Sequence, residues 1–164
     1  GRTAFDELVT PYVGDIRSFV SARVDGPEID DVVQDTLVAA WKAMPMFDGR
    51  SRFRTWIFGI CVHKIKDHYR TKSRKRPEIS LDSGFSNPVV DGLQNRTETN
   101  DAVSAAMKRL PETQFEVIEL YYRQRLTLAE ISGILERNLN TVKYQFCQGH
   151  VRLANFLKEE GLIQ

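Results

Sequence analysis

Apolar side chains recur along this chain at three- and four-residue intervals, the spacing of amphipathic α-helices, and strand patterns are almost absent. In the first half, this spacing predicts helices over about residues 5–20, 27–44 and 53–72. Pro11 falls inside the first of them and is expected to mark a kink or a fresh start. The predicted inward stripe of the third helix consists of Trp56, Ile57, Ile60, Cys61, Ile65 and Tyr69. Three helices with apolar faces predict one small bundle.

The helical period is interrupted after Arg76, where two prolines, two glycines and scattered Ser, Asn and Asp predict a flexible linker. The period resumes after Asn100, a predicted N-cap, and Pro111 begins a further helix. We therefore expect an all-α fold in which two small helical domains are joined by a linker. The expected bounds are 1–77 for the first domain, 78–100 for the linker and 101–164 for the second domain.

A helix-turn-helix pattern lies near the C-terminus. Thr127 and Glu130 have the spacing of a capping box, which opens a short helix over 128–135, and Asn138 is expected to cap a second helix. Two short helices joined by a tight turn are typical of DNA-binding proteins, in which the second helix enters the major groove. An ordinary helical hairpin is the alternative. The polar residues that lead the second helix are Asn140, Thr141, Lys143, Tyr144 and Gln145.

The formal net charge of +1 hides an uneven distribution of charge. Residues 1–77 carry 14 basic and 10 acidic groups, whereas residues 100–164 carry 8 of each. From Arg50 to Arg76 there are ten Lys or Arg residues and one acid, Asp67. The rings interleaved with these cations are Phe47, Phe53, Trp56, Phe58 and Tyr69. Because bases stack on rings and cations follow phosphates, the segment is predicted to bind an unpaired nucleic-acid strand; a ring-filled core with solvated charges is the alternative.

The sequence gives little support for a membrane span, secretion, metal binding or catalysis. No apolar run approaches the roughly 20 residues of a membrane span, and no secretory signal is recognised, so a cytoplasmic protein is expected. Cys61 and Cys147 lack metal-ligand spacing and are predicted to be buried free thiols. A metal-dependent nuclease would need Glu28, Asp30, Asp31 and Asp35 with His63 or His68. The helix dipole alone explains acids at a helix start, so we expect no catalytic residues, metal or cofactor.

Two segments carry a resemblance to a known family. Residues 29–60, IDDVVQDTLVAAWKAMPMFDGRSRFRTWIFGI, resemble region 2 of the extracytoplasmic-function (ECF) group of bacterial sigma factors. Residues 110–146, LPETQFEVIELYYRQRLTLAEISGILERNLNTVKYQF, are similar to region 4 of that group. The resemblance implies a promoter-specificity subunit that binds RNA polymerase core, the −35 element as duplex and the −10 element as a melted strand. It also implies a partner that restrains the chain, an anti-sigma factor.

The resemblance implies three sets of site residues. The helix that docks on the coiled coil of the largest polymerase subunit would present Asp31, Gln34, Asp35 and Trp41. The loop that captures a flipped −10 base, with the helix after it, would contribute Phe47, Asp48, Arg50, Arg52, Phe53, Arg54, Trp56, His63, Lys64 and Lys66. The −35 duplex would be bound by Asn140, Thr141, Lys143, Tyr144, Gln145 and Gln148.

The reading helix departs from the family pattern. Gln145, Gln148 and His150 stand where Arg is usual, so weaker attraction to phosphates and an altered −35 preference are expected. Gln145 is expected to address an adenine edge through its paired donor and acceptor. In the turn before the helix, Glu136 stands where Gly is common. In the strand-binding segment, His63 stands where Asn is frequent.

A rival function is a helix-turn-helix regulator that is not a polymerase subunit. The basic aromatic segment argues against it, because a protein that binds only duplex DNA has little use for such a surface. The free energies of DNA opening and of base stacking also indicate that the chain needs a partner. Opening about a dozen base pairs costs about 17 kcal/mol, whereas stacking one base on a ring returns roughly 1 to 3 kcal/mol. A larger enzyme must therefore supply most of the free energy of opening.

Overall fold

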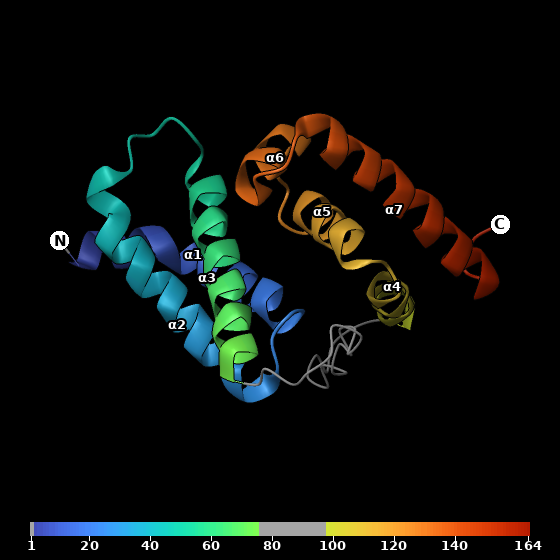
Figure 1. The fold of residues 1–164 in the computed structure, drawn as a ribbon, viewed down its shortest axis with the longest axis horizontal. Coiled ribbons are helices and arrows are strands. Elements are labelled where there is room, and N and C mark those ends of the chain that lie inside the picture. Colours follow the sequence, from blue (N-terminus) through green and yellow to red (C-terminus); the bar gives the residue numbers. More distant parts are fainter. Residues whose placement is uncertain (1, 76–97) are drawn as a thin grey trace. The chain divides into compact units, whose positions relative to one another are not determined.

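The computed structural model describes residues 2–75 and 98–164, and within these ranges the backbone forms helices and no strands (Figure 1). The chain divides into two compact units, Gly1–Val90 and Asp91–Gln164. These features confirm the predicted all-α fold with two helical domains. Most of the predicted linker, residues 78–97, lies outside the described residues. Asn100 is already inside a helix that begins at Glu98, so the prediction of an N-cap there is wrong.

Residues 2–75, the described part of the first unit, form three α-helices and one short 3-10 helix. The helices are α1 (Arg2–Ser21), α2 (Gly26–Ala43), η1 (Met44–Met46) and α3 (Phe53–Lys75). Both α1 and α3 pack against α2, and α3 lies across α1 as well (Figure 1). Helix α1 continues through Pro11 instead of starting afresh there. The Pro11 ring is exposed, and buried residues on both sides of it, Val9 and Ile16, hold the helix together despite the missing N–H donor.

The core of the first unit draws on all three α-helices. It includes Ile16, Phe19, Val20, Val32, Val33, Ala40, Ile57, Phe58, Cys61, Val62 and Ile65, all of which are buried. The Phe19 and Phe58 rings meet edge to face, with their centroids 5.8 Å apart. Phe58 was expected among the base-stacking rings; it is fully buried, so its role is packing of the core.

The two cysteines lie in different environments. Cys61 is buried, as predicted, whereas Cys147 is exposed, which contradicts the prediction for that residue. Desolvation by burial raises the pKa of the Cys61 thiol from 9.0 to about 12, although a hydrogen bond with Thr36 and the charge of Arg23 oppose the shift. Because the unfolded chain then loses this proton first, the contribution of Cys61 to stability is full below pH 9 and is lost as the pH rises toward 12.

This difference predicts one reactive thiol in the native chain. At pH 8, a chromogenic thiol reagent is expected to modify Cys147 rapidly and Cys61 only after denaturation, because the thiolate is the nucleophile. Counting the thiols modified before and after adding guanidinium checks this. The replacement Cys147→Ser should abolish the fast phase, and two fast thiols in the native chain would contradict the buried position of Cys61.

Polar contacts fasten the second half of α3 to the turn between α1 and α2. His68 Nε2 lies 3.0 Å from Glu28 Oε2, and Lys72 Nζ lies 3.4 Å from Asp25 Oδ2. The Tyr69 hydroxyl donates to the backbone carbonyl of Arg23. Glu28 and His68, considered above for a nuclease site, therefore hold the bundle together. In the part of the chain that the structure describes, no three His, Cys, Asp or Glu residues are grouped so that they could hold a metal ion.

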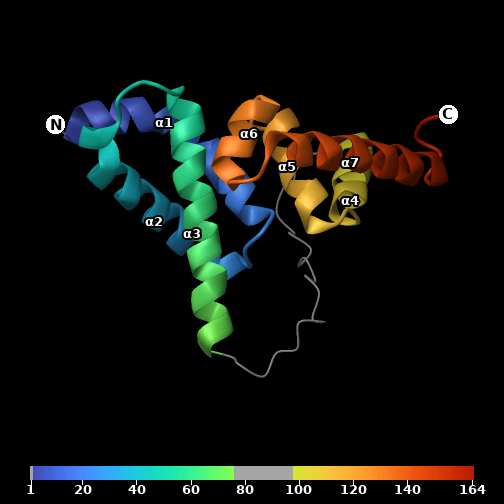
Figure 2. The same cartoon turned by 45° about the horizontal axis from the view of Figure 1, so that its top comes forward.

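Four α-helices lie within residues 98–164, the part of the second unit that the structure describes. They are α4 (Glu98–Lys108), α5 (Glu112–Tyr122), α6 (Leu128–Leu135) and α7 (Leu139–Glu159). Helix α7 packs against the other three, and Figure 2 shows it extending past α5 and α4. The buried residues include Val117, Ile118, Leu120, Leu126, Ile131, Leu135 and Val142. Among the residues that the structure describes, no helix is long and apolar enough to cross a membrane.

Local caps define the two helices of the helix-turn-helix. Thr127 Oγ1 accepts from the Glu130 amide at 3.1 Å, and the Thr127 amide donates back to Glu130 Oε1 at 3.0 Å, so the predicted capping box is confirmed. Asn138 Oδ1 accepts from the Asn140 amide at 2.8 Å and caps α7 as predicted. Glu136, in the turn, has φ 55, a left-handed conformation that explains why glycine suits this position.

Helices α5 and α7 approach each other closely at Gly149. A Cβ atom added there would lie 2.4 Å from Cδ1 of Ile118, whose side chain is 1% exposed and has little room to move. By contrast, a Cβ added at Gly133, in α6, would meet nothing within 4 Å. The two glycines therefore form a matched pair within one unit.

We expect opposite effects on stability from alanine at these positions. Gly133→Ala should raise the free energy of unfolding by roughly 0.5 to 1 kcal/mol, because alanine restricts the unfolded chain and favours helix. Gly149→Ala has the same gain, but overpacking costs about 1 to 3 kcal/mol, so a net loss is expected. Urea unfolding of both variants measures the difference. A Gly149→Ala chain more stable than the parent would contradict the close approach.

Candidate nucleic-acid interface

Three rings at the start of α3 form a cluster at the surface of the first unit. Phe47 follows η1, while Phe53 and Trp56 belong to the first turn of α3. The Phe47 and Trp56 centroids lie 5.0 Å apart, and those of Phe53 and Trp56 lie 5.5 Å apart. Tyr12, from α1, packs against Phe53, with the two ring centroids 5.2 Å apart. All four residues are half-buried, so each is packed against neighbours and also partly exposed to solvent.

The loop between η1 and α3 places charge beside this ring cluster. The Arg50 amide donates to Asp48 Oδ1 at 3.0 Å, and Gly49 between them has φ 77, which glycine adopts without strain. The Arg50 side chain is 91% exposed and also meets Asp48, at 3.1 Å. Arg52 is exposed as well. The turn therefore presents cations next to partly exposed rings, the combination that suits an unpaired strand.

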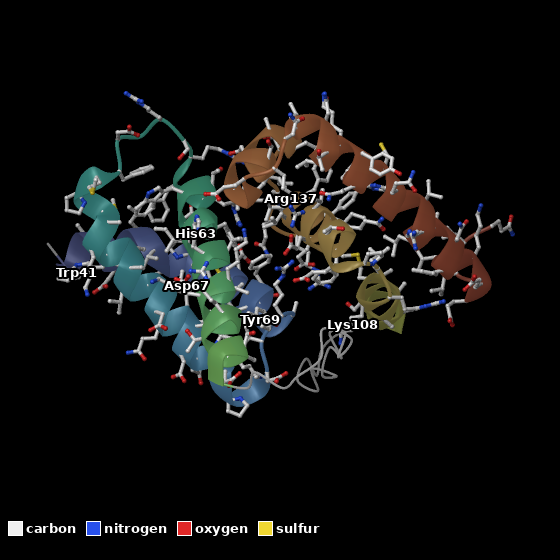
Figure 3. The ribbon with its side chains drawn as sticks, in the orientation of Figure 1. Trp41, His63, Asp67, Tyr69, Lys108 and Arg137 are labelled. Carbon is white, nitrogen blue, oxygen red and sulfur yellow. The ribbon has the colours of Figure 1, made fainter. Side chains whose placement is uncertain are left out.

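One side of α3 continues from the ring cluster. One face of α3 includes three predicted residues. His63 comes seven residues after Trp56, and Lys66 comes three residues after His63, so helical spacing places all three on this face. His63 and Lys66 are exposed, and Lys64 is half-buried. Asp67, one acid among these bases, lies 4.0 Å from Lys64 (Figure 3). This side of α3 is thus mixed in charge at the end that is farther from the rings.

Arg54 has a different position from the other predicted strand-binding residues. Its Nη2 donates to Asp15 Oδ2 at 2.7 Å, and its guanidinium lies over the rings of Tyr12 and Phe58, at 5.4 and 5.6 Å. The side chain is 21% exposed. These contacts tie α3 to α1, so Arg54 supports the bundle, and its contact with a nucleic-acid strand stays a prediction.

The outer face of α2 combines acids with exposed apolar residues. Asp31, Gln34 and Asp35 are exposed, as the sequence predicts for a docking face. Val38, 44% exposed, and Trp41, 50% exposed, continue the same stripe toward the end of the helix (Figure 3). An exposed tryptophan beside aliphatic and acidic side chains is typical of a protein-binding surface.

Sequence reasoning missed part of this surface. Val38 lies one turn before Trp41 on the exposed side of α2. The signal was present, because Val38 falls outside the inward stripe of α2. We call the set formed by Asp31, Gln34, Asp35, Val38 and Trp41 the α2 face.

The reading helix presents most of the predicted residues to solvent. Asn140, Thr141, Lys143 and Tyr144 are exposed, and the last is 66% exposed. Gln145 and Gln148 are half-buried at one edge of this surface. Arg152, which was not predicted, is exposed one turn after Gln148. Arg152 comes seven residues after Gln145, and this helical spacing could have predicted that both lie on one face of α7.

A polar network joins the reading helix to α5. Arg137 Nη1 donates to Gln145 Oε1 at 3.2 Å and lies 3.5 Å from the backbone carbonyl of Thr113. Arg137 Nη2 donates to the carboxylate of Glu116, whose side chain is 7% exposed. Figure 3 shows Arg137 in this region of the second unit. The network links three separate segments of the chain and was not predicted.

His150 lies on the inner flank of α7, not on the reading surface. Its Nε2 is 2.6 Å from the Tyr122 hydroxyl, and its Nδ1 is 2.9 Å from the backbone carbonyl of Phe146. The Phe146 and His150 rings meet with centroids 4.2 Å apart. At a position where the sigma factor pattern usually has Arg, this chain therefore uses the side chain to join α7 to α5.

Comparisons with protein families match both units. A model of Sigma-70 region 2 matches residues 8–75, and a model of Sigma-70 region 4 matches residues 100–153. Among curated proteins, the chain is 29% identical to the ECF RNA polymerase sigma-E factor of Escherichia coli (strain K12), across 98% of this chain and 89% of that protein. The protein of the same name from Haemophilus influenzae is 25% identical, across 94% of this chain and 87% of the other.

Two solved structures share the fold. The sigma factor RpoE from Bartonella quintana, in complex with the anti-sigma factor NepR, gives a TM-score of 0.80 at 22% identity, and the match covers 94% of this chain and 97% of that one. CnrH in complex with the cytosolic domain of CnrY gives a TM-score of 0.68 at 25% identity, covering 97% and 90%. The chain therefore shares a fold with these two proteins along nearly its whole length.

Proposed function

The chain belongs to the sigma-70 family of RNA polymerase sigma factors, within its ECF group, and from this premise we propose how its two units divide the work. It is a transcription initiation factor that binds RNA polymerase core and promoter DNA. Sigma factors confer promoter specificity on the polymerase and are not enzymes themselves. The match to region 2 sets aside a helix-turn-helix regulator that acts apart from polymerase.

The α2 face is the proposed contact with polymerase core. Its acids suit a basic partner, and Trp41 with Val38 offers apolar area that a docked helix would cover. Trp is among the residues that dominate binding free energy at interfaces. The proposed partner is the coiled coil of the largest polymerase subunit. Asp31 and Asp35 lie one turn apart on this face, so a single helix of the partner can meet both.

The ring cluster and the loop before α3 form the proposed −10 site. A base that leaves the duplex stacks on the accessible parts of Phe47 and Trp56, while Arg50 and Arg52 attract the neighbouring phosphates. The strand then follows α3 past His63 and Lys66. Packing behind the rings, by Tyr12 and the rest of the bundle, keeps the platform in place before the strand arrives.

The second unit is proposed to bind the −35 element as duplex, with α7 in the major groove. Asn140, Thr141 and Tyr144 lead the helix and are exposed where a recognition helix meets base edges. Lys143 and Arg152 are the exposed cations of this helix nearest to that surface. Because α7 has few cations, attraction to phosphates should contribute less to its DNA affinity than it does for an Arg-rich reading helix.

Regulation and location follow from the same family membership. RpoE was solved with an anti-sigma factor, and we infer that a protein of this kind restrains this chain as well. Because its work is done on polymerase, the chain is proposed to act in the cytoplasm. The interval over 78–100 is proposed to span between the two promoter elements.

The single observation that supports this division is the coexistence of a surface ring cluster beside exposed cations with a separate helix-turn-helix unit. Transcription by purified bacterial core on a promoter library tests it. Transcripts should depend on the chain and should start downstream of shared −35 and −10 elements. Initiation without a shared −10 element would contradict the role of the ring cluster.

A further inference from the structure

The orientation of the Gln145 amide is determined by the chemistry of its neighbour. Arg137 Nη1 lies 3.2 Å from the Gln145 side chain. An arginine guanidinium has five N–H donors and no acceptor, so the atom that faces it must be the carbonyl oxygen Oε1. The oxygen and nitrogen of a glutamine amide are otherwise hard to tell apart, and a donor-only partner removes that ambiguity. The Gln145 NH2 group therefore points away from Arg137.

Arg137 is itself held in place. Its Nη2 donates to Glu116, a carboxylate buried in α5, and its Nη1 also approaches the Thr113 carbonyl at 3.5 Å. The Arg137 side chain is 22% exposed. Moving it toward DNA would leave the Glu116 charge buried without this partner, which is costly. The carbonyl of Gln145 thus faces a donor that stays where it is.

We propose that Gln145 reads its base with the NH2 group alone and that Arg137 is the positioning residue that makes it a donor. This proposal deepens the function proposed above, because it needs α7 to be the reading helix. In the major groove, guanine presents two acceptors, O6 and N7, whereas cytosine presents only the N4 donor. A glutamine that shows only donors therefore favours guanine and rejects cytosine most strongly.

This proposal differs from the expectation that Gln145 addresses adenine. Recognition of adenine by glutamine uses both amide atoms, the oxygen for N6–H and the nitrogen for N7. Oε1 has two lone pairs, and Arg137 takes one of them. Because Arg137 is bonded to Glu116 and so turns Oε1 toward α5, the proposal assigns the base contact to the second bond, through the NH2 group. The N6–H2 group of adenine would then meet the Gln145 NH2 group, donor against donor. Adenine therefore ranks below guanine at this position.

Replacing Gln145 with glutamate isolates the donor. Gln145→Glu keeps an oxygen toward Arg137 and exchanges the outward NH2 for a second oxygen, which accepts from cytosine N4. The probe is the full chain bound to polymerase core, selecting from promoters with a randomised −35 element and a fixed −10 element. At one position, the parent should prefer guanine, and Gln145→Glu should prefer cytosine, each by on the order of 10-fold.

A second variant tests the positioning role of Arg137. The pair Arg137→Met with Glu116→Gln removes both charges of the network together, so no buried charge is left alone. With its carbonyl released, Gln145 should shift in preference from guanine toward adenine at the same position. Thermal unfolding shows that the variant is folded. A purely structural network would change the unfolding temperature and leave base preference as in the parent, which would overturn the positioning role.

Gln148→Glu is the matched control, because it makes the same chemical change one turn later on α7. It should leave the preference at the Gln145 position unchanged. The inference is overturned if the parent prefers adenine there, or if Gln145→Glu and the parent select the same base. A holoenzyme that shows base preference at −10 and none anywhere in −35 would instead contradict the proposed role of the second unit, and the inference with it.

Discussion

Replacing Trp41 with alanine is expected to weaken binding of the chain to RNA polymerase core by about 30- to 1,000-fold. Tryptophans at the centre of interfaces contribute roughly 2 to 4 kcal/mol, and Trp41 projects half-exposed from the α2 face. Its removal also leaves Val38 without its apolar neighbour on that stripe. Titration of fluorescently labelled chain with purified core, in the absence of DNA, measures the dissociation constant.

Two further variants make this result specific. Tyr144→Ala removes an even more exposed ring, 66% exposed, from the second unit, and its affinity for core should match that of the parent. The double change Asp31→Lys with Asp35→Lys should weaken binding and reverse its response to salt, because the two exposed carboxylates steer a basic partner. Core affinity of Trp41→Ala within about threefold of the parent would place the interface elsewhere.

Replacing Phe47 with alanine is expected to lower promoter opening by roughly 5- to 150-fold and to leave binding to the −35 duplex unchanged. One base stacked on a ring contributes roughly 1 to 3 kcal/mol, and Phe47 lies 5.0 Å from Trp56 at the loop that the strand would meet. Permanganate reactivity of thymines near −10, in complexes of the chain with core, reports the opened fraction.

Met46→Ala is the control for the Phe47 variant. Met46 is the preceding residue, its side chain is 85% exposed, and it carries no ring. This change should leave opening within about twofold of the parent. If Phe47→Ala opens the promoter as well as Met46→Ala does, the ring cluster is not the site that captures the −10 base.

Features set by local chemistry could be predicted from the sequence. The capping box of Thr127 with Glu130 and the cap at Asn138 depend on residues two or three positions apart, and both are present. Of the kink or fresh start expected at Pro11, the fresh start is absent, because buried residues on both sides of Pro11 keep α1 continuous and a local rule does not include that packing. Likewise, burial of Phe58 and exposure of Cys147 depend on which side of a helix meets another helix.

For the candidate sites too, features set by local sequence could be predicted, and features set by packing between helices could not. Most exposed residues of the α2 face and of the reading helix could be predicted from helical spacing together with a family resemblance, whereas Val38 and Arg152 were missed. The network of Glu116, Arg137 and Gln145 could not, because its members are 21 and 8 residues apart and meet only after α5 and α7 have packed. Arg54 illustrates the reverse case, since a cation in a basic segment is held by Asp15, 39 residues earlier.

The division of labour has an energetic basis. Stacking a base on the ring cluster returns a few kcal/mol at most, which is far below the cost of about 17 kcal/mol for opening a dozen base pairs. The first unit therefore selects and holds a strand that polymerase helps to open. The second unit, with few cations on α7, positions the complex on duplex DNA and contributes specificity more than affinity.

Formation of a joint complex with bacterial RNA polymerase core shows whether this protein directs the polymerase to promoters. The purified chain and core should co-elute in size-exclusion chromatography at micromolar concentration. The complex should then produce a transcript, from a promoter with −35 and −10 elements, that neither component makes alone. Separate elution of the two, with no transcript that depends on the chain, would contradict the claim that this protein directs the polymerase to promoters.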